Sequence, residues 1–273
     1  MHIGVEPCNL LKCDMMLAVF ESIVPYLLIL TNCILFKVAR NILFPLTPRK
    51  FRIFVSEFIS TLELCATISE LGVVWQKHGD IGCSTCILLC CLWWWKVFGD
   101  AEAGPFGIVD ECILLKRPIT SFDIVLRSTA LILAATLTAL YTQAFWCLHL
   151  TSEHIALHTL KCEAALQVSV VQGFAIEFLI SFISRIVALE SFRFPDKIAM
   201  WVNAIATTIL CRAALHTTGG FFNPILASAL TLNCKGNNLF EHFTVYWVGA
   251  LLGGLLARYI HIKLQQISRK KIE

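Results

Sequence analysis

The chain has 273 residues, of which 57% are hydrophobic and only 15% charged, and its net charge is +3. An ordinary soluble domain carries about 25% charged residues, so this composition, with a mean hydropathy of +0.73, excludes a typical water-soluble protein. The small basic excess is spread between apolar runs instead of forming a patch, which argues against nucleic acid as a partner. The expected surrounding is the lipid bilayer.

Seven apolar runs approach the roughly 20 residues that a helix needs to cross the hydrocarbon. In chain order they are 15–38, 51–75, 83–98, 124–148, 166–189, 198–215 and 243–262. The first run has no basic lead-in and no obvious cleavage site, so it is interpreted as an extra span or a membrane-embedded packing helix, not a signal peptide. These runs predict an all-α membrane protein.

Two shorter apolar stretches, 105–115 and 224–232, each begin at a proline after a glycine-containing turn. Proline is tolerated at the first position of a helix because its missing N–H has no helical partner there. The stretches have about half the length that a spanning helix requires. They are either loops outside the membrane or re-entrant half-helices that line an internal cavity.

An internal repeat favours the half-helices. The segment around Glu57 returns around Glu177, 120 residues later, and Gly104-Pro105-Phe106 returns 119 residues later as Asn223-Pro224-Ile225. Each half then has three spanning helices with a half-helix after the second, and the odd number of spans inverts one half. The two half-helices are expected to enter from opposite faces and to meet at their N-termini.

Three regions follow from the repeat. We expect residues 1–50 to form an N-terminal hydrophobic helix and a basic cytosolic loop, 51–262 to form the duplicated membrane domain with repeats 51–150 and 166–262, and 263–273 to form a basic cytosolic tail. The basic residues of four loops fall on one side, which the positive-inside rule assigns to the cytosol: Lys37, Arg40, Arg49, Lys50, Arg52, Lys116, Arg117, Arg193, Lys197, Lys263, Arg269, Lys270 and Lys271.

Most of the thirteen cysteines lie inside apolar runs, where they are expected to pack as small hydrophobic groups. Cys83 and Cys86 have the spacing of a redox or metal pair, but a second pair at ligand spacing is missing from the sequence, and no metal site is predicted. Cys162 and Cys234 fall in polar loops and are free to pair in an oxidising lumen.

Two segments carry a specific resemblance. They are Thr218-Gly219-Gly220-Phe221-Phe222-Asn223-Pro224 and the glycine-rich stretch 246–257. On these segments and the two glutamate-bearing helices the chain resembles the aquaporins, and within them the superaquaporin group. The resemblance implies a homotetramer with one pore per protomer, water as the permeant, no cofactor, and an intracellular membrane, chiefly the endoplasmic reticulum.

The pore motifs depart from the family pattern. Gly104-Pro105-Phe106 stands where most aquaporins have Asn-Pro-Ala, so one side-chain donor is missing and a bulky ring replaces a methyl group. The second motif keeps Asn223 and Pro224 but has Ile225. Leu226 replaces the arginine of a typical water-selective member, which predicts an apolar selectivity filter of Cys211, Gly220 and Leu226. Such a filter suits slow water, glycerol or hydrogen peroxide. Arg212 is a candidate replacement for the missing charge, although it points about 100° away from Cys211.

Four acidic residues carry alternatives. The resemblance assigns Glu57 and Glu177 to supporting the pore loops by accepting from backbone N–H groups, in preference to contacting a substrate. Asp100 and Glu102 precede the first half-helix, where an acid either caps its free N–H groups or weakens the cation barrier, with the cap favoured.

These features predict a passive channel for water and small neutral solutes. No nucleophile and base converge in the sequence, so an enzyme is not expected. The alternative is a non-conducting scaffold that kept the fold while Phe106 and Ile225 filled the pore. A coupled transporter is disfavoured, because carboxylate pairs beyond Glu57 and Glu177 are not apparent along the predicted lumen.

Overall fold

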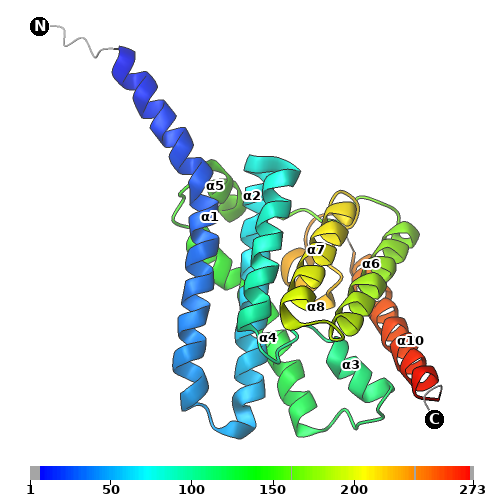
Figure 1. Ribbon diagram of the computed structural model, residues 1–273. Helices are drawn as coiled ribbons and strands as arrows, with labels where there is room; N and C mark the ends of the chain where they lie inside the picture. Colours follow the sequence, from blue (N-terminus) through cyan, green and yellow to red (C-terminus); the bar gives the residue numbers. More distant parts are fainter. Residues whose placement is uncertain (1–6, 161, 237, 271–273) are drawn as a thin grey trace, which may run out of the picture.

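The computed structural model describes residues 7–160, 162–236 and 238–270, with side chains over 15–160, 162–236 and 238–267. Residues 1–6 of the N-terminal segment, Lys161, and residues 271–273 of the basic tail, which include Lys271, lie outside this description. The described chain is helical (Figure 1), with elements α1 (Pro7–Leu46), η1 (Arg49–Phe51), α2 (Arg52–Val97), α3 (Phe106–Ile113), α4 (Phe122–Trp146), α5 (Ser152–Thr159), α6 (Val170–Ser191), α7 (Asp196–Ala214), α8 (Pro224–Thr231), α9 (Leu239–His242), η2 (Phe243–Gly249) and α10 (Ala250–Lys270).

Five helical segments are long and apolar enough to cross a membrane: Met15–Leu46, Arg49–Val97, Phe122–Trp146, Val170–Ser191 and Leu239–Ile267. Two of the seven predicted runs are joined in one of these segments. The expected break between them lies at Gly79, where α2 bends sharply, because its φ of 62° and ψ of −163° lie outside helical geometry. Glycine accepts this left-handed backbone without steric cost. The sixth run forms α7, a 19-residue helix outside that set of five.

The two short stretches form half-helices. α3 and α8 have eight residues each, a length of about 12 Å at 1.5 Å per residue. Each packs against the other half of the chain, α3 against α10 and α8 against α4. The all-α inverted-repeat fold predicted from the sequence is confirmed, and each half-helix is held by the half to which it does not belong.

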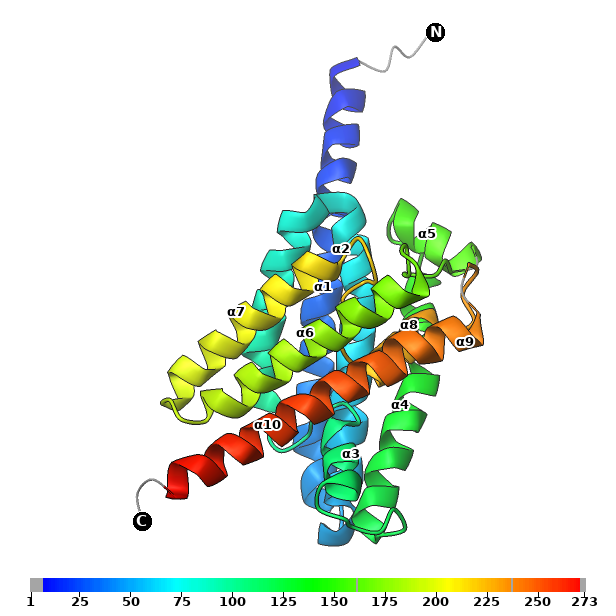
Figure 2. The same ribbon diagram turned by 90° about the vertical axis from the view of Figure 1, so that its right-hand side faces the viewer.

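Glycines at the end of η2 and in α10 bring these segments close to α6. A Cβ atom at Gly253 would lie 2.2 Å from the Phe178 carbonyl oxygen, and one at Gly249 would lie 3.0 Å from the Phe174 carbonyl oxygen. Small residues allow such backbone contact between helices in membranes. Figure 2 shows α6, α7 and α10 running obliquely across the upright α1 and α2.

The N-terminal helix α1 packs along α2 through polar contacts. Asn32 Nδ2 donates to Thr67 Oγ1 at 2.7 Å, and Tyr141 of α4 donates to Asn32 Oδ1 at 2.7 Å. Farther along α1, Arg40 Nη1 lies 2.6 Å from Glu63 Oε2, and the Glu63 side chain is fully buried. The outer face of α1 is apolar and exposed, with Leu27, Leu30, Ile34, Leu35 and Ile42 among its residues. α1 is therefore a packed part of the helical bundle with one face free for lipid.

The short helix α5 was not expected from the sequence, which reads as a loop there. His154 of α5 is buried and lies 2.9 Å from Glu70 of α2, while Glu153 lies 2.7 Å from Lys77. Partial burial raises the pKa of Glu153, but the hydrogen bonds from Lys77, from its own backbone and from Thr151, with the charge of Lys77, together outweigh it and leave this pKa below its usual value. These contacts attach α5 to the bend region of α2.

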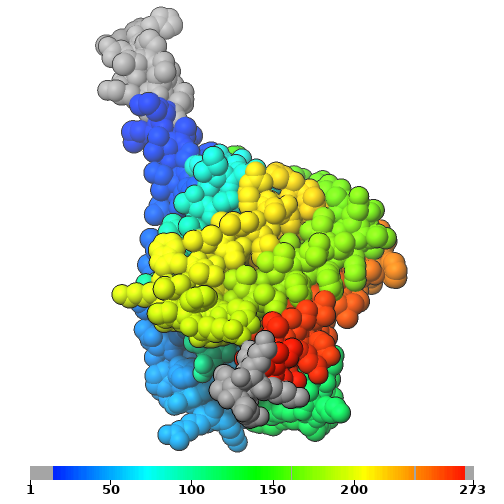
Figure 3. All heavy atoms as spheres, turned by 45° about the vertical axis from the view of Figure 1, so that its right-hand side comes forward, coloured from blue at the N-terminus to red at the C-terminus, as the bar shows by residue number. Residues whose placement is uncertain are grey.

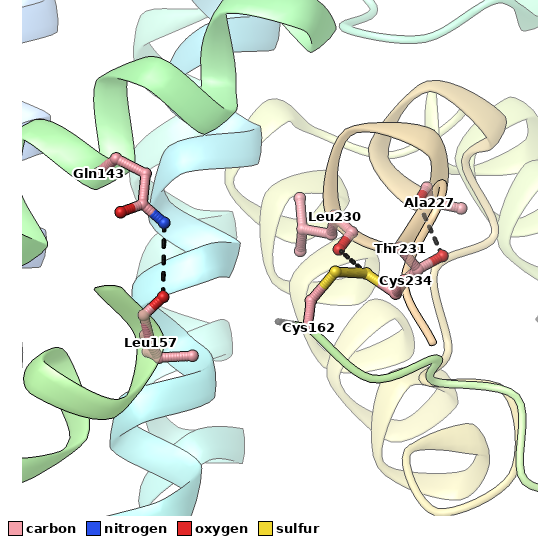
Figure 4. The surroundings of a disulfide bond; sticks show 7 residues. All are labelled: Gln143, Leu157, Cys162, Ala227, Leu230, Thr231 and Cys234. Carbon is pink, nitrogen blue, oxygen red and sulfur yellow. Dashed lines mark hydrogen bonds between the residues drawn. A yellow bond between two sulfur atoms is a disulfide. The ribbon is translucent and has the colours of Figure 1, made fainter. Parts of the chain in front are cut away.

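Cys162 and Cys234, whose pairing the sequence left open, form a disulfide with a Cα–Cα distance of 4.9 Å (Figure 4). Two backbone hydrogen bonds flank it, from Ala164 N to Lys235 O at 2.8 Å and from Lys235 N to Cys162 O at 3.0 Å. The bond joins the α5–α6 connection to the loop after α8. In Figures 1 and 2 the turn before α2, the turn after α3 and the end of α10 lie at the opposite end of the bundle from α5.

The Arg40–Glu63 pair generates a stability prediction. Replacing Arg40 by methionine leaves the buried Glu63 carboxylate without its cation, so Arg40→Met is expected to lower the free energy of unfolding by about 3–5 kcal/mol. The measurement is the thermal midpoint of the purified protein in detergent. Lys37→Met is the control, because Lys37 lies over the Trp93 ring at 5.4 Å on an exposed part of α1 and its loss is expected to cost less than about 1 kcal/mol. Equal midpoints for the two variants would contradict the prediction.

Candidate functional site

Glu177 of α6 holds the second pore loop in place through hydrogen bonds. Its carboxylate is buried and accepts three hydrogen bonds, from Thr218 Oγ1 at 2.6 Å, Phe221 N at 3.3 Å and Phe222 N at 2.8 Å. Phe222 has a φ of 31° and Gly220 a φ of 62°, so this stretch cannot use helical hydrogen bonds. The carboxylate supplies the acceptors that irregular backbone at membrane depth needs.

Glu57 of α2 holds the first pore loop through hydrogen bonds in the same way. Glu57 accepts from Glu102 N at 3.3 Å and from Ala103 N at 3.0 Å. It differs from Glu177 in also receiving a charged donor, because Arg127 Nε of α4 lies 3.3 Å from Glu57 Oε1. Both glutamates therefore contact backbone N–H groups of the loops, which is the contact that the resemblance implies.

The two half-helices meet at Asn223. Its Oδ1 accepts from Ile225 N at 3.0 Å and Leu226 N at 3.4 Å, which caps α8. Its Nδ2 donates to Ala103 O of the first loop at 2.8 Å. A Cβ atom at Gly104 would lie 3.1 Å from Asn223 Nδ2 and 3.3 Å from Oδ1. The amide of Asn223 therefore occupies space that a side chain at position 104 would need.

The two bulky residues of the motifs point toward the opposite halves. The ring of Phe106 packs on Gly254 of α10, where an added Cβ atom would lie 2.4 Å from its Cε1. Ile225 is 4% exposed and packs with Ile108 of α3 and Ile124 of α4. Each side chain is lodged against a helix of the other repeat.

The predicted filter residues are only partly together. Cys211 Sγ lies 3.7 Å from Gly220 O, and a Cβ atom at Gly220 would lie 3.0 Å from Cys211 O, so these two residues are in contact. Leu226 is 6% exposed and packs in a separate apolar cluster that includes Cys65 and Tyr246. Cys83 and Cys86 belong to a third cluster of apolar side chains, between α1 and α2.

Arg212 forms an ion pair with Asp80 and not with the predicted filter residues. Its Nη2 lies 2.6 Å from Asp80 Oδ2, next to the bend of α2, and its side chain is 46% exposed. His216 Nε2 and Trp75 Nε1 also contact the Asp80 carboxylate, at 3.2 and 2.8 Å. The arginine is thus neutralised at the edge of the bundle and supplies no free charge to Cys211 and Gly220.

Glu102 caps the first half-helix. Its Oε2 accepts from Gly107 N at 2.7 Å, in the first turn of α3. Two guanidinium groups flank it, Arg127 of the first half at 3.9 Å and Arg185 of the second half at 3.7 Å. Arg185 also lies over the Phe106 ring, 5.7 Å from its centroid. The sequence marked Glu102 as a cap, but neither arginine, because both come from distant helices.

Comparisons with known proteins identify the family of the chain. Aquaporin-11 of Milnesium tardigradum is 30% identical to this chain over 247 residues, which cover 90% of this chain and 88% of that protein. The chain belongs to the aquaporin family. Aquaporin-11 of Rattus norvegicus is 30% identical over 207 residues, covering 74% and 75% of the two chains, and Aquaporin-12 of Mus musculus is 27% identical over 245 residues, covering 84% and 82%. No family model matches the chain.

These relatives place the chain in the superaquaporin group of the aquaporins, as its resemblance implied. It is an integral, multi-pass membrane protein. Within this aquaporin, the first motif reads Gly104-Pro105-Phe106, the second reads Asn223-Pro224-Ile225, and both surround the contact between Asn223 and Ala103.

Substitutions of two neighbouring glycines of α10 test whether the Phe106 ring of this aquaporin packs on Gly254. An added methyl group at Gly253 meets the Phe178 backbone, whereas one at Gly254 meets only the Phe106 ring, which can turn. Gly253→Ala is therefore expected to cost more than Gly254→Ala, by about 1–3 kcal/mol. In a Phe106→Ala background the cost of Gly254→Ala is expected to vanish, while that of Gly253→Ala persists. Thermal unfolding in detergent measures the two glycine variants, Phe106→Ala and the two double variants, and an identical cost of Gly254→Ala in both backgrounds would contradict the seating of the ring.

Proposed function

We propose that this protein is a passive channel for water and small neutral solutes, including glycerol and hydrogen peroxide. The observation that carries the proposal is the junction of the two half-helices, where Asn223 caps α8 and reaches Ala103 of the first loop. Helix N-termini carry partial positive charge and free N–H groups, so a permeating molecule that accepts hydrogen bonds is stabilised there.

The side chains near the second loop favour neutral solutes that tolerate an apolar passage. Cys211 and Gly220, which are in contact, offer a thiol and a backbone in place of a charged group. Arg212, the nearest arginine along the chain, is paired with Asp80. A passage without a fixed cation is wider in its selectivity than one that must hydrogen-bond water at a guanidinium group.

The alternative is a non-conducting scaffold with the aquaporin fold. It required Phe106 and Ile225 to fill the passage. Their packing against Gly254 and Ile124 favours conduction, because both side chains have a place outside the contact between Asn223 and Ala103. The non-conducting scaffold is therefore the second candidate function.

For the site within the cell we propose the endoplasmic reticulum membrane, with the α5 end in the lumen. The Cys162–Cys234 disulfide supports this orientation, because disulfides persist in oxidising compartments. We also propose a homotetramer. Figure 3 shows α6 and α7 side by side on one face, and apolar residues along them are exposed and available to lipid or a second copy: Leu179, Ile183, Trp201, Ile205 and Ile209.

Proteoliposomes test the channel. Stopped-flow shrinkage is expected to be several-fold faster than in empty vesicles for water, with glycerol and peroxide entry also raised. Asn223→Ala should slow all three, because it removes the amide at the junction. Asn238→Ala is the matched control, since Asn238 also caps a helix, α9, but lies away from the junction. If vesicles with the unaltered protein shrink and take up solutes no faster than empty vesicles, the channel is contradicted and the non-conducting scaffold is favoured.

Engineered glycosylation tests the orientation. The chain has no Asn-x-Ser/Thr sequence, and His149→Asn and Pro118→Asn each create one. His149 has a φ of 51°, a backbone conformation that asparagine accepts well. Expression with endoplasmic reticulum membranes is expected to glycosylate the His149→Asn variant alone, seen as a mass shift removed by endoglycosidase. A glycan on the Pro118→Asn variant would reverse the proposed orientation.

A further inference from the structure

The junction of the two half-helices offers a water molecule fewer side-chain N–H donors than a channel with asparagine in both motifs. A water-filled channel blocks protons when donors fix the water at its narrowest point and positive charge surrounds it. Asn223 is the only side-chain amide of the two motifs, because position 104 is glycine. An amide carries two N–H donors, and one of them is used by Ala103 O at 2.8 Å. One donor therefore remains for a water molecule.

A single donor leaves the water chain intact. A water oxygen has two lone pairs, and one hydrogen bond from Asn223 occupies only one of them. The second accepts from the next water, so hydrogen bonds run continuously past the junction. Gly104 leaves room for this position of Asn223, because an added Cβ atom would lie 3.1 Å from Asn223 Nδ2.

The positive charge at the junction is also reduced. α8 is capped by the neutral oxygen of Asn223, so its N-terminal charge of roughly +0.5 persists. α3 is capped by the Glu102 carboxylate at 2.7 Å from Gly107 N. That anion more than offsets the partial charge of the first half-helix. Because Arg127 and Arg185 reach Glu102 from different halves of the chain, it lies between the halves, and its side chain is still 34% exposed.

The flanking arginines do not restore the barrier. Arg127 has closer partners in Glu111 at 2.9 Å and Glu57 at 3.3 Å. Arg185 has a closer partner in Asp110 at 2.9 Å, and Arg258 also approaches Asp110, at 3.8 Å. Glu111 is also paired with Arg117, which reaches Asp123. In this network five carboxylates face four guanidinium groups, and Glu102 has no ion-pair contact shorter than 3.7 Å.

We propose that this channel also conducts protons, and that Glu102 sets the rate. The inference rests on the proposed function, because the conductor is the water column of the open channel. In each step an O–H bond of a hydronium breaks, the proton forms a new O–H bond with the next water, and the positive charge moves on with it. Protein groups keep their protonation throughout.

The experiment compares two fluxes in one preparation of proteoliposomes. An entrapped pH dye reports proton entry after an acid step, with potassium and valinomycin holding the voltage at zero, and stopped-flow shrinkage reports water. The unaltered protein is expected to raise both above empty vesicles. Glu102→Gln keeps an acceptor for Gly107 N but removes the charge, so the ratio of proton to water permeability should fall roughly tenfold.

Glu241→Gln is the matched control, because Glu241 accepts a backbone N–H at the start of α9, away from the junction. Its ratio is expected to equal that of the unaltered protein. Water flux without proton flux above empty vesicles, or an unchanged ratio in Glu102→Gln, would overturn the proton inference and leave the proposed channel standing. Loss of both fluxes in the unaltered protein would overturn the two together.

Discussion

Backbone that leaves helical geometry at membrane depth has to find acceptors for its N–H groups within the protein, since the hydrocarbon offers none. Glu57 and Glu177 supply them. Each carboxylate holds the loop that precedes a half-helix, and the position of each half-helix follows from that loop. The junction at Asn223, the placement of Phe106 and Ile225, and the interlocking of the two repeats all depend on these two buried anions.

The two halves meet this requirement with different neighbours. Glu177 receives a neutral hydroxyl from Thr218, and the helix it supports is capped by the amide of Asn223. Glu57 receives a guanidinium group from Arg127, and its helix is capped by the carboxylate of Glu102. The first half thus uses ion pairs where the second half uses neutral polar groups.

The sequence was sufficient for the elements that repeat. The spacing of the repeat predicts the two half-helices, the equivalent positions of Glu57 and Glu177, and the all-α fold. It does so because an internal duplication encodes the same structure in both halves. The break between the runs 51–75 and 83–98 was also predictable, and it lies at Gly79. The helix α5 was missed, since a short polar stretch between apolar runs reads as a loop. The alternative in which Phe106 fills the pore could not be weighed from the sequence, because nothing in its own segment reveals Gly254, almost 150 residues away, on which its ring packs. The arginines around Glu102 were hidden for the same reason.

The contacts of α1 have a consequence for how the chain enters the membrane during synthesis. Asn32 and Arg40 leave the ribosome before their partners Thr67 and Glu63, so α1 first meets lipid with polar groups unpaired. A charge within a membrane helix is costly to insert alone. The first limb of α2 brings Glu63 only 23 residues after Arg40. Insertion of α1 and that limb as one hairpin removes the cost, which makes the first two helices a single unit of biogenesis.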